Sequence, residues 1–218
     1  MGAQNSVEKN ERMGRIDQSL QPHLPKLTPK KALINVSRMS GKLSRSDWID
    51  AALETLLEEG INGVKILQLS RKLGTSRGSF YWHFGSRAEL LQAILEDWKE
   101  KSTEPVVDYI SALDLGPTER IFELMRFVME SERVKYDLAI RAWALYDANA
   151  RATVRATDKR RLGYVDNLFR EAGFDADQAA SRTRLLANYL TWDQSLGMQE
   201  SEAVKKKRLI LRHKLLTS

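Results

Sequence analysis

Apolar residues recur every three or four positions through most of the chain, which is the spacing of one buried face of an α-helix. Four such segments are predicted in the N-terminal half, at about 44–60, 66–73, 75–84 and 86–98. Glycine ends the first two, at Gly60 and Gly74, and Ser86 with Glu89 three residues later opens the fourth in the pattern of a capping box. No run of five or more residues alternates with the period of a strand, so the pattern predicts an all-α fold.

The C-terminal half continues this helical periodicity without an internal repeat. Helices are expected to begin near Pro105 and Pro117, because proline is tolerated in the first turn of a helix. Further helices are predicted at about 132–148, 150–171, 176–196 and 201–216. Residues 1–41 show no such periodicity and carry three of the five prolines, so a flexible arm is expected there.

Composition narrows the classes of function. The chain has 218 residues, of which 42% are hydrophobic, and this is enough to bury a core of its own. It contains no cysteine, which excludes disulfides, thiolate metal sites and a cysteine nucleophile. The three histidines do not have the spacing of metal ligands, and the sequence has no phosphate-binding glycine loop. We therefore expect no metal site and no cofactor. No apolar run reaches the roughly 20 residues that span a bilayer, and the N-terminus lacks an apolar signal core, so we expect a cytoplasmic protein without membrane contact.

Positive charge is concentrated in two stretches of a chain whose net charge is +6. Six Lys or Arg and no acid occur between residues 26 and 45, and five with no acid occur between 65 and 87. Acidic residues lie between the two, along the first predicted helix. This distribution favours a surface that faces a polyanion. For the first stretch, DNA contact and a solubilising tail are both open.

Residues 65–84 have the form of a helix-turn-helix, in which a glycine turn joins two short helices. On the second helix, Phe80 and Phe84 are four residues apart and can pack inward. The outward face then holds Arg77, Ser79, Tyr81, Trp82 and His83. Exposed aromatic side chains are costly unless something covers them. A DNA groove would, because arginine can reach guanine edges while the other polar groups donate to phosphates.

The stretch from Arg45 to Trp98 resembles the N-terminal DNA-binding domain of the TetR family of transcriptional regulators. The matching motifs are Leu69-Ser70-x-x-Leu73-Gly74-Thr75-Ser76, Gly78-Ser79-Phe80-Tyr81-Trp82-His83-Phe84 and Ser86-x-x-Glu89-Leu90-Leu91. The DNA-binding residues that this resemblance implies are Arg45, Lys65, Thr75, Ser76, Arg77, Gly78, Ser79, Tyr81, Trp82, His83 and Arg87. Among them, Arg77 and Ser79 would meet base edges. The residues that would meet phosphates are Tyr81, Trp82, His83 and Arg87, and Arg45 would lie near the backbone.

Two positions depart from the family pattern, which usually has a capping Thr and often an Arg where this chain has Lys65 and Leu67. The helix cap is therefore expected to be weaker by about 1 kcal/mol. Lys65 can supply a phosphate contact in place of the missing arginine.

The resemblance also implies an organisation of the whole chain. Residues 1–42 would form the flexible basic arm, 43–102 the helix-turn-helix DNA-binding domain, and 103–218 a helical bundle for ligand binding and dimerisation. The expected protein is not an enzyme. It is a homodimer that binds a palindromic operator in double-stranded DNA and is released by a small, largely apolar effector. The implied role is a repressor, with activation left open.

Two sets of residues follow from the same resemblance. The seam between two copies would be formed by Leu185, Leu186, Tyr189, Leu190, Val204, Leu211 and Leu215. An effector pocket would be lined by Trp98, Tyr109, Phe122, Met125, Met129, Trp143 and Tyr146, with Arg141 or Asp147 as polar anchors.

Two other functions compete with a ligand-responsive regulator. Gly74-Thr75-Ser76-Arg77-Gly78 matches the nucleophile elbow of serine hydrolases, but that elbow needs a preceding strand and a downstream acid and histidine. A DNA-binding architectural protein without an effector would need only the N-terminal helices, which leaves the residues from 103 onward without a purpose.

Overall fold

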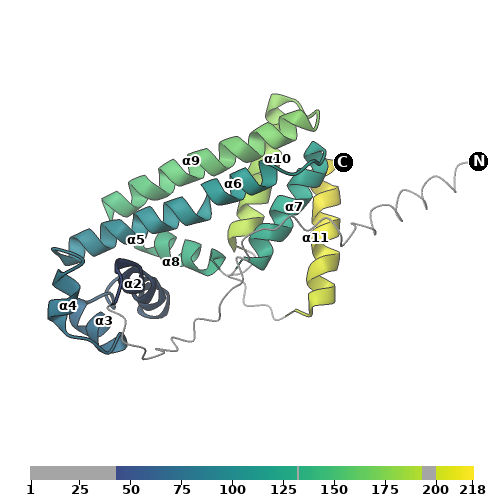
Figure 1. The fold of residues 1–218 in the computed structure, drawn as a ribbon. Coiled ribbons are helices and arrows are strands. Elements are labelled where there is room, and N and C mark those ends of the chain that lie inside the picture. Colours follow the sequence, from purple (N-terminus) through teal and green to yellow (C-terminus); the bar gives the residue numbers. More distant parts are fainter. Residues whose placement is uncertain (1–42, 132, 193–199) are drawn as a thin grey trace, which may run out of the picture. The chain divides into compact units, whose positions relative to one another are not determined.

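The structure is a computed structural model that describes residues 43–131, 133–192 and 200–218. Every regular element in these ranges is an α-helix, which confirms the predicted all-α class (Figure 1). The helices are α2 (Arg45–Glu59), α3 (Ile66–Lys72), α4 (Arg77–Tyr81), α5 (Arg87–Ser102), α6 (Glu104–Ser111), α7 (Pro117–Glu130), α8 (Val134–Ala144), α9 (Ala148–Glu171), α10 (Ala176–Trp192) and α11 (Glu202–Thr217). The predicted arm, 1–42, lies outside the described residues. None of the described helices is long and apolar enough to cross a membrane.

Short-range capping fixes where the first helices begin and end. The Ser44 hydroxyl accepts from the Asp47 N–H at 3.3 Å, and the Asp47 carboxylate accepts from the Ser44 N–H at 2.7 Å, so α2 opens with a capping box. Gly60 and Gly74 follow α2 and α3 with φ of +70° and +64°, a conformation that favours glycine. Pro105 and Pro117 stand in the first turns of α6 and α7, as predicted.

Two local predictions need correction. The helix α4 ends at Tyr81 rather than at Phe84, because the N–H groups of both His83 and Phe84 bond to the Phe80 carbonyl and the chain turns there. The capping box before α5 is only half formed. The Ser86 hydroxyl accepts from the Glu89 N–H at 3.2 Å, but the Glu89 carboxylate accepts from Gly85 instead of Ser86.

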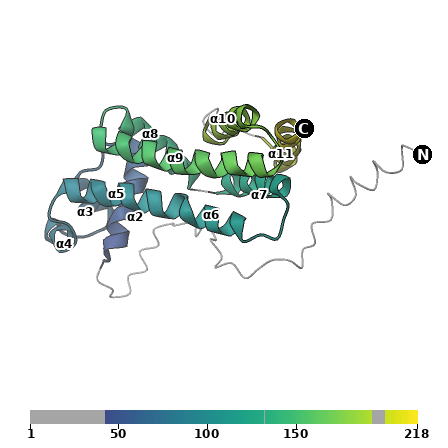
Figure 2. The same cartoon turned by 90° about the horizontal axis from the view of Figure 1, so that it is seen from above.

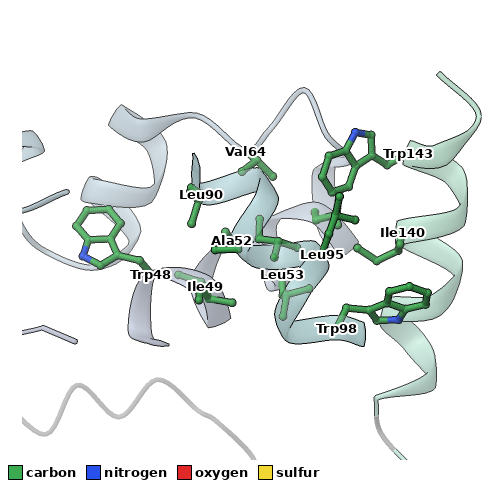
Figure 3. Packing of buried hydrophobic residues seen from close by; sticks show 14 of the residues in the cluster. Trp48, Ile49, Ala52, Leu53, Val64, Leu90, Leu95, Trp98, Ile140 and Trp143 are labelled. Atoms are coloured by element: carbon green, nitrogen blue, oxygen red, sulfur yellow. The ribbon is translucent and has the colours of Figure 1, made fainter. Parts of the chain in front are cut away.

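Two hydrophobic cores organise the helices. The first joins α2–α5 with α8 and the start of α9, and Figure 3 shows Ile140 and Trp143 of α8 packed with Leu95 and Trp98 of α5. The second joins α6, α7, α10 and α11 with the end of α9. The helix α9 therefore contributes to both cores and lies beside α5 and α6 (Figure 2). The predicted boundary at residue 102 separates a DNA-binding domain from a C-terminal domain. It stays a prediction, because α8 follows this boundary in the chain but packs in the first core.

Candidate nucleic-acid interface

The second helix of the helix-turn-helix, α4, is held by two buried phenylalanines. Phe80 and Phe84 are 0% and 1% exposed, with their ring centroids 5.4 Å apart. Trp48 of α2 meets the Phe80 ring edge-on at 5.3 Å. The inward orientation predicted for Phe80 and Phe84 is confirmed, and it fixes which face of this short helix points outward.

The outward face of α4 carries the exposed aromatic and polar side chains. Tyr81 is 58% exposed and Trp82 is 80% exposed, with Arg77 exposed and Ser79 and His83 partly exposed beside them. Large exposed aromatic side chains in such a cluster mark a surface that another molecule covers.

The start of α4 is set by Ser76 and Gly78. The Ser76 hydroxyl accepts from the Ser79 N–H at 3.3 Å and so caps the helix. Gly78 is exposed, and a Cβ there would lie 3.4 Å from Ser76 Oγ, an ordinary contact, so packing within the chain does not demand glycine at this position. Thr75 is partly exposed in the turn before them.

Basic side chains in this region fall into two groups. Lys65, Arg71 and Arg77 are exposed, and Lys65 occupies the N-cap position of α3 without a side-chain cap, as the departure from the family pattern predicted. Lys72 instead lies 3.6 Å from Glu54 and 3.0 Å from Glu58 of α2. The acidic helix therefore neutralises part of the second basic stretch.

Arg45, at the start of α2, lies next to the end of α4. Its guanidinium carbon is 4.6 Å from the centroid of the Phe84 ring, which is the geometry of a cation–π contact. The side chain remains exposed. The fold thus brings Arg45 close to the residues that follow α4, although the two are far apart in the sequence.

Arg87 has a structural partner that the sequence did not reveal. Its Nε donates to the Val64 carbonyl at 2.6 Å, and its Nη2 donates to the Ile61 carbonyl at 2.8 Å. Arg87 thus ties the start of α5 to the loop between α2 and α3. The phosphate contact implied for this residue stays a prediction, and only the third guanidinium nitrogen has no bond to that loop.

Replacing Arg87 by alanine is expected to lower the free energy of unfolding by about 1–3 kcal/mol, because hydrogen bonds to a charged donor are lost and two loop carbonyls change partners. Urea unfolding measures the effect, and Arg71→Ala, at an exposed site in α3, serves as the control with a change within about 0.5 kcal/mol. Equal stabilities of the two variants would contradict the anchoring role of Arg87.

The hydrolase alternative finds no support in this geometry. Ser76 follows the helix α3 and a turn, where a nucleophile elbow follows a strand, and its hydroxyl caps α4. Of the two downstream histidines, His83 lies just past the opposite end of α4, and His213 bonds to the Thr118 carbonyl at 2.8 Å. Among the described residues, no group of three His, Cys, Asp or Glu side chains is arranged to hold a metal ion.

The residues predicted for an effector pocket do not come together. Trp98 and Trp143 belong to the first core, whereas Tyr109, Phe122, Met125 and Met129 belong to or pack against the second. Tyr146 is 89% exposed. In this structure the seven residues do not line one common cavity, because six of them are divided between two cores and the seventh is exposed.

The proposed polar anchors of that pocket are engaged elsewhere. Arg141 donates to both carboxylate oxygens of Asp158, at 2.8 and 2.6 Å, and this pairing raises the pKa of the guanidinium. Asp147 caps α9 by accepting from the Ala150 N–H at 2.8 Å.

The residues predicted for the dimer seam also divide. Leu186 is 0% exposed in the second core, so its side chain packs within its own chain, and its place in a seam stays a prediction. Tyr189 and Leu190 pack against the same core, with the Tyr189 hydroxyl 2.8 Å from Met129 Sδ. The exposed members of the set are Leu185, Val204, Leu211 and Leu215.

Comparison with known proteins shows which family the N-terminal helices resemble. The family described as bacterial regulatory proteins, tetR family, matches residues 49–94. The regulator SrpR of Pseudomonas putida is 44% identical over 52 residues, and the class D tetracycline repressor protein of Escherichia coli is 43% identical over 53 residues. Each match covers 24% of this chain and 24% of the relative, so the chain spans about a quarter of the length of these curated relatives.

The likeness in fold extends further than the likeness in sequence. A solved structure of AibR in complex with isovaleryl coenzyme A and operator DNA superposes with a TM-score of 0.62 at 15% identity, covering 76% of this chain and 95% of that one. Residues 49–94 therefore match the DNA-binding domain model of the tetR family, and the helical fold of the chain is similar to that of AibR.

Proposed function

We propose that the chain is a DNA-binding transcriptional regulator that reads an operator in double-stranded DNA with α4. The observation that carries the proposal is the outward face of this helix, where Tyr81, Trp82 and Arg77 are exposed on a segment fixed by buried phenylalanines. The matched tetR family, and a fold neighbour described in complex with operator DNA, support the same function.

The proposed contacts divide into base edges and backbone. Arg77 and Ser79, near the N-terminus of α4, enter the major groove, where arginine can form two hydrogen bonds with guanine. Tyr81, Trp82 and His83 donate to phosphates, and Lys65 and Arg45 approach the backbone on either side. Packing within the chain does not require glycine at the exposed position 78. A close approach of the DNA backbone to Gly78 would explain why this position has no side chain.

The regulator is proposed to act as a homodimer on a palindromic site. A single recognition helix reads too few base pairs for a specific operator, and two-fold symmetric proteins meet half-sites about 34–36 Å apart. The exposed leucine and valine side chains of α10 and α11 supply an apolar face for a second copy. In this proposal residues 43–102 bind DNA and residues 103–218 provide dimerisation and effector control.

Repression with release by an effector is the proposed mode of control. It is supported by the name of one relative, the class D tetracycline repressor, and by the isovaleryl coenzyme A bound to the fold neighbour AibR. The effector would favour a helix arrangement in which the two recognition helices no longer fit both half-sites.

The test of DNA readout begins with selecting bound fragments from genomic DNA and measuring affinity by fluorescence polarisation. Arg77→Ala is expected to cost about 1–3 kcal/mol and to relax base preference at one position per half-site. Lys65→Ala is expected to weaken all sequences alike and to lower the salt slope by about one unit. Lys206→Ala, at an exposed position of α11, is the control and should leave both the base preference and the salt slope unchanged. If Arg77→Ala and Lys65→Ala alter base preference identically, the assigned contacts are wrong.

A further inference from the structure

An apolar groove of about 470 Å³ lies between α8 and the end of α2 with the loop that follows it. Its walls are formed mainly by Leu57, Ile61, Leu138, Ala142, Trp143 and Tyr146. This volume falls in the usual range of small-molecule sites, roughly 300–1,000 Å³. Two of the residues predicted for an effector pocket, Trp143 and Tyr146, therefore meet here rather than in the centre of the C-terminal helices.

The rim of this groove exposes large apolar side chains to water. Leu57 is 40% exposed and Tyr146 is 89% exposed, and Leu145 beside Tyr146 is 66% exposed. Apolar side chains gathered in this way around a hollow are unfavourable in water and are typical of a surface that binds a ligand.

Charge at the groove selects the kind of ligand. Glu59 is the one charged side chain among the lining residues, in a chain whose net charge is +6. Its carboxylate accepts from the neutral amide of Gln68, at 2.6 and 2.5 Å, and forms no ion pair within the described part of the chain. By contrast, the neighbouring acids Glu54 and Glu58 both pair with Lys72.

A carboxylate without a cationic partner in the lining of a groove that also includes Trp143 and Tyr146 is complementary to an organic cation. The exposed ring of Tyr146 attracts positive charge through its face, and the apolar walls cover the rest of such a molecule. We propose that this groove is an effector site for an apolar organic cation, an inference that rests on the proposed function of the chain as a DNA-binding regulator.

The position of the groove connects it to the recognition helix. The loop residue Ile61 forms part of the wall, and its carbonyl is held by Arg87, the first residue of α5. The same loop leads directly into α3 and then α4. A ligand seated between this loop and α8 would favour an arrangement in which the two are further apart, so it would change the position of α4 relative to α8.

The experiment compares two ions of the same shape and opposite charge, tetraphenylphosphonium and tetraphenylborate, by titration calorimetry on the full chain. The groove should bind the phosphonium. Glu59→Gln should weaken this binding about fivefold, as expected for loss of one exposed charge contact. Ala142→Trp should abolish it by filling the groove from an exposed helix position. The matched control is Glu58→Gln, which removes a neighbouring carboxylate outside the groove and should leave the affinity unchanged.

Phosphonium binding that is equal in Glu59→Gln, Glu58→Gln and the unchanged chain would overturn the proposal, as would binding that survives Ala142→Trp. Urea unfolding of Ala142→Trp verifies that this variant is folded, and Glu59→Gln provides a test that does not depend on it. Fluorescence polarisation with operator DNA is measured separately, with and without the phosphonium. Failure of the chain to bind any DNA refutes the proposed function, whereas calorimetry alone decides whether the groove binds the cation.

Discussion

Replacing Asp137 by alanine is expected to lower the free energy of unfolding by about 3 kcal/mol, because the partly buried Arg161 guanidinium and the Trp98 indole N–H both lose the carboxylate that accepts from them. Asp137 lies in α8 and is 8% exposed. Its carboxylate accepts from the Trp98 indole N–H at 2.8 Å and from Arg161 Nη1 at 2.7 Å, so one side chain joins α5, α8 and α9. Arg141 Nη2 adds a further ion pair at 3.6 Å.

The contacts of Arg161 explain why the loss is large. Its guanidinium also donates to the side chains of Ser102 and Thr103, at 2.8 and 3.1 Å, and lies 5.2 Å from the centroid of the Trp98 ring. These groups are held at the junction of α5 and α6, where removal of Asp137 leaves a partly buried positive charge without its carboxylate partner.

Two further variants identify the charge as the cause of this loss. Asp137→Asn keeps the shape and one acceptor oxygen, so its effect in urea unfolding should lie between those of the wild type and Asp137→Ala. Asp158→Asn removes a carboxylate that is 31% exposed and pairs with Arg141, and it should cost about 1 kcal/mol or less. If Asp137→Ala proves no more destabilising than Asp158→Asn, the buried carboxylate does not hold these three helices together.

The features that sequence predicted well are those set within one or two helical turns. Periodic apolar positions gave the helix spans, and the spacing of Phe80 and Phe84 gave the inward face of α4. Glycine at positive φ marked the ends of α2 and α3. Such features depend on neighbours three or four residues away, so the sequence contains them directly.

The features that it missed depend on residues far apart in the chain. Asp137 meets Trp98 across 39 positions, and Arg87 meets the Val64 carbonyl across 23. An aromatic residue on an amphipathic helix indicates that one face is buried, but it does not say in which core. For this reason Trp98 and Met125 were assigned to one pocket although they lie in different cores.

The seam of the proposed homodimer shows the same limit. The stripe on α10 contains both Leu185 and Leu186, and periodicity alone cannot separate a residue that packs within its own chain from one that meets a partner. Burial separates them, since Leu186 is 0% exposed and Leu185 is 62% exposed. A charge at Leu186 would disrupt the second core, so it cannot test dimerisation.

Exposed positions on α11 provide that test. Leu211 and Leu215 are 51% and 74% exposed, so the double variant Leu211→Glu/Leu215→Glu should fold as the parent chain does. It should sediment as a monomer at micromolar concentration, because two charges on each copy would face an apolar surface of the other. Operator affinity should fall by about a hundredfold or more, since the second half-site is then bound without the benefit of linkage.

The control for this prediction is Leu115→Glu, which places the same charge at a leucine that is 42% exposed between α6 and α7. This variant should remain dimeric and bind the operator with unchanged affinity. A parent chain that is already monomeric at micromolar concentration would refute the seam on α10 and α11. A double variant that stays dimeric would place the contact between copies on another face. Burying two unpaired carboxylates in the seam would destabilise the dimer too strongly for it to persist.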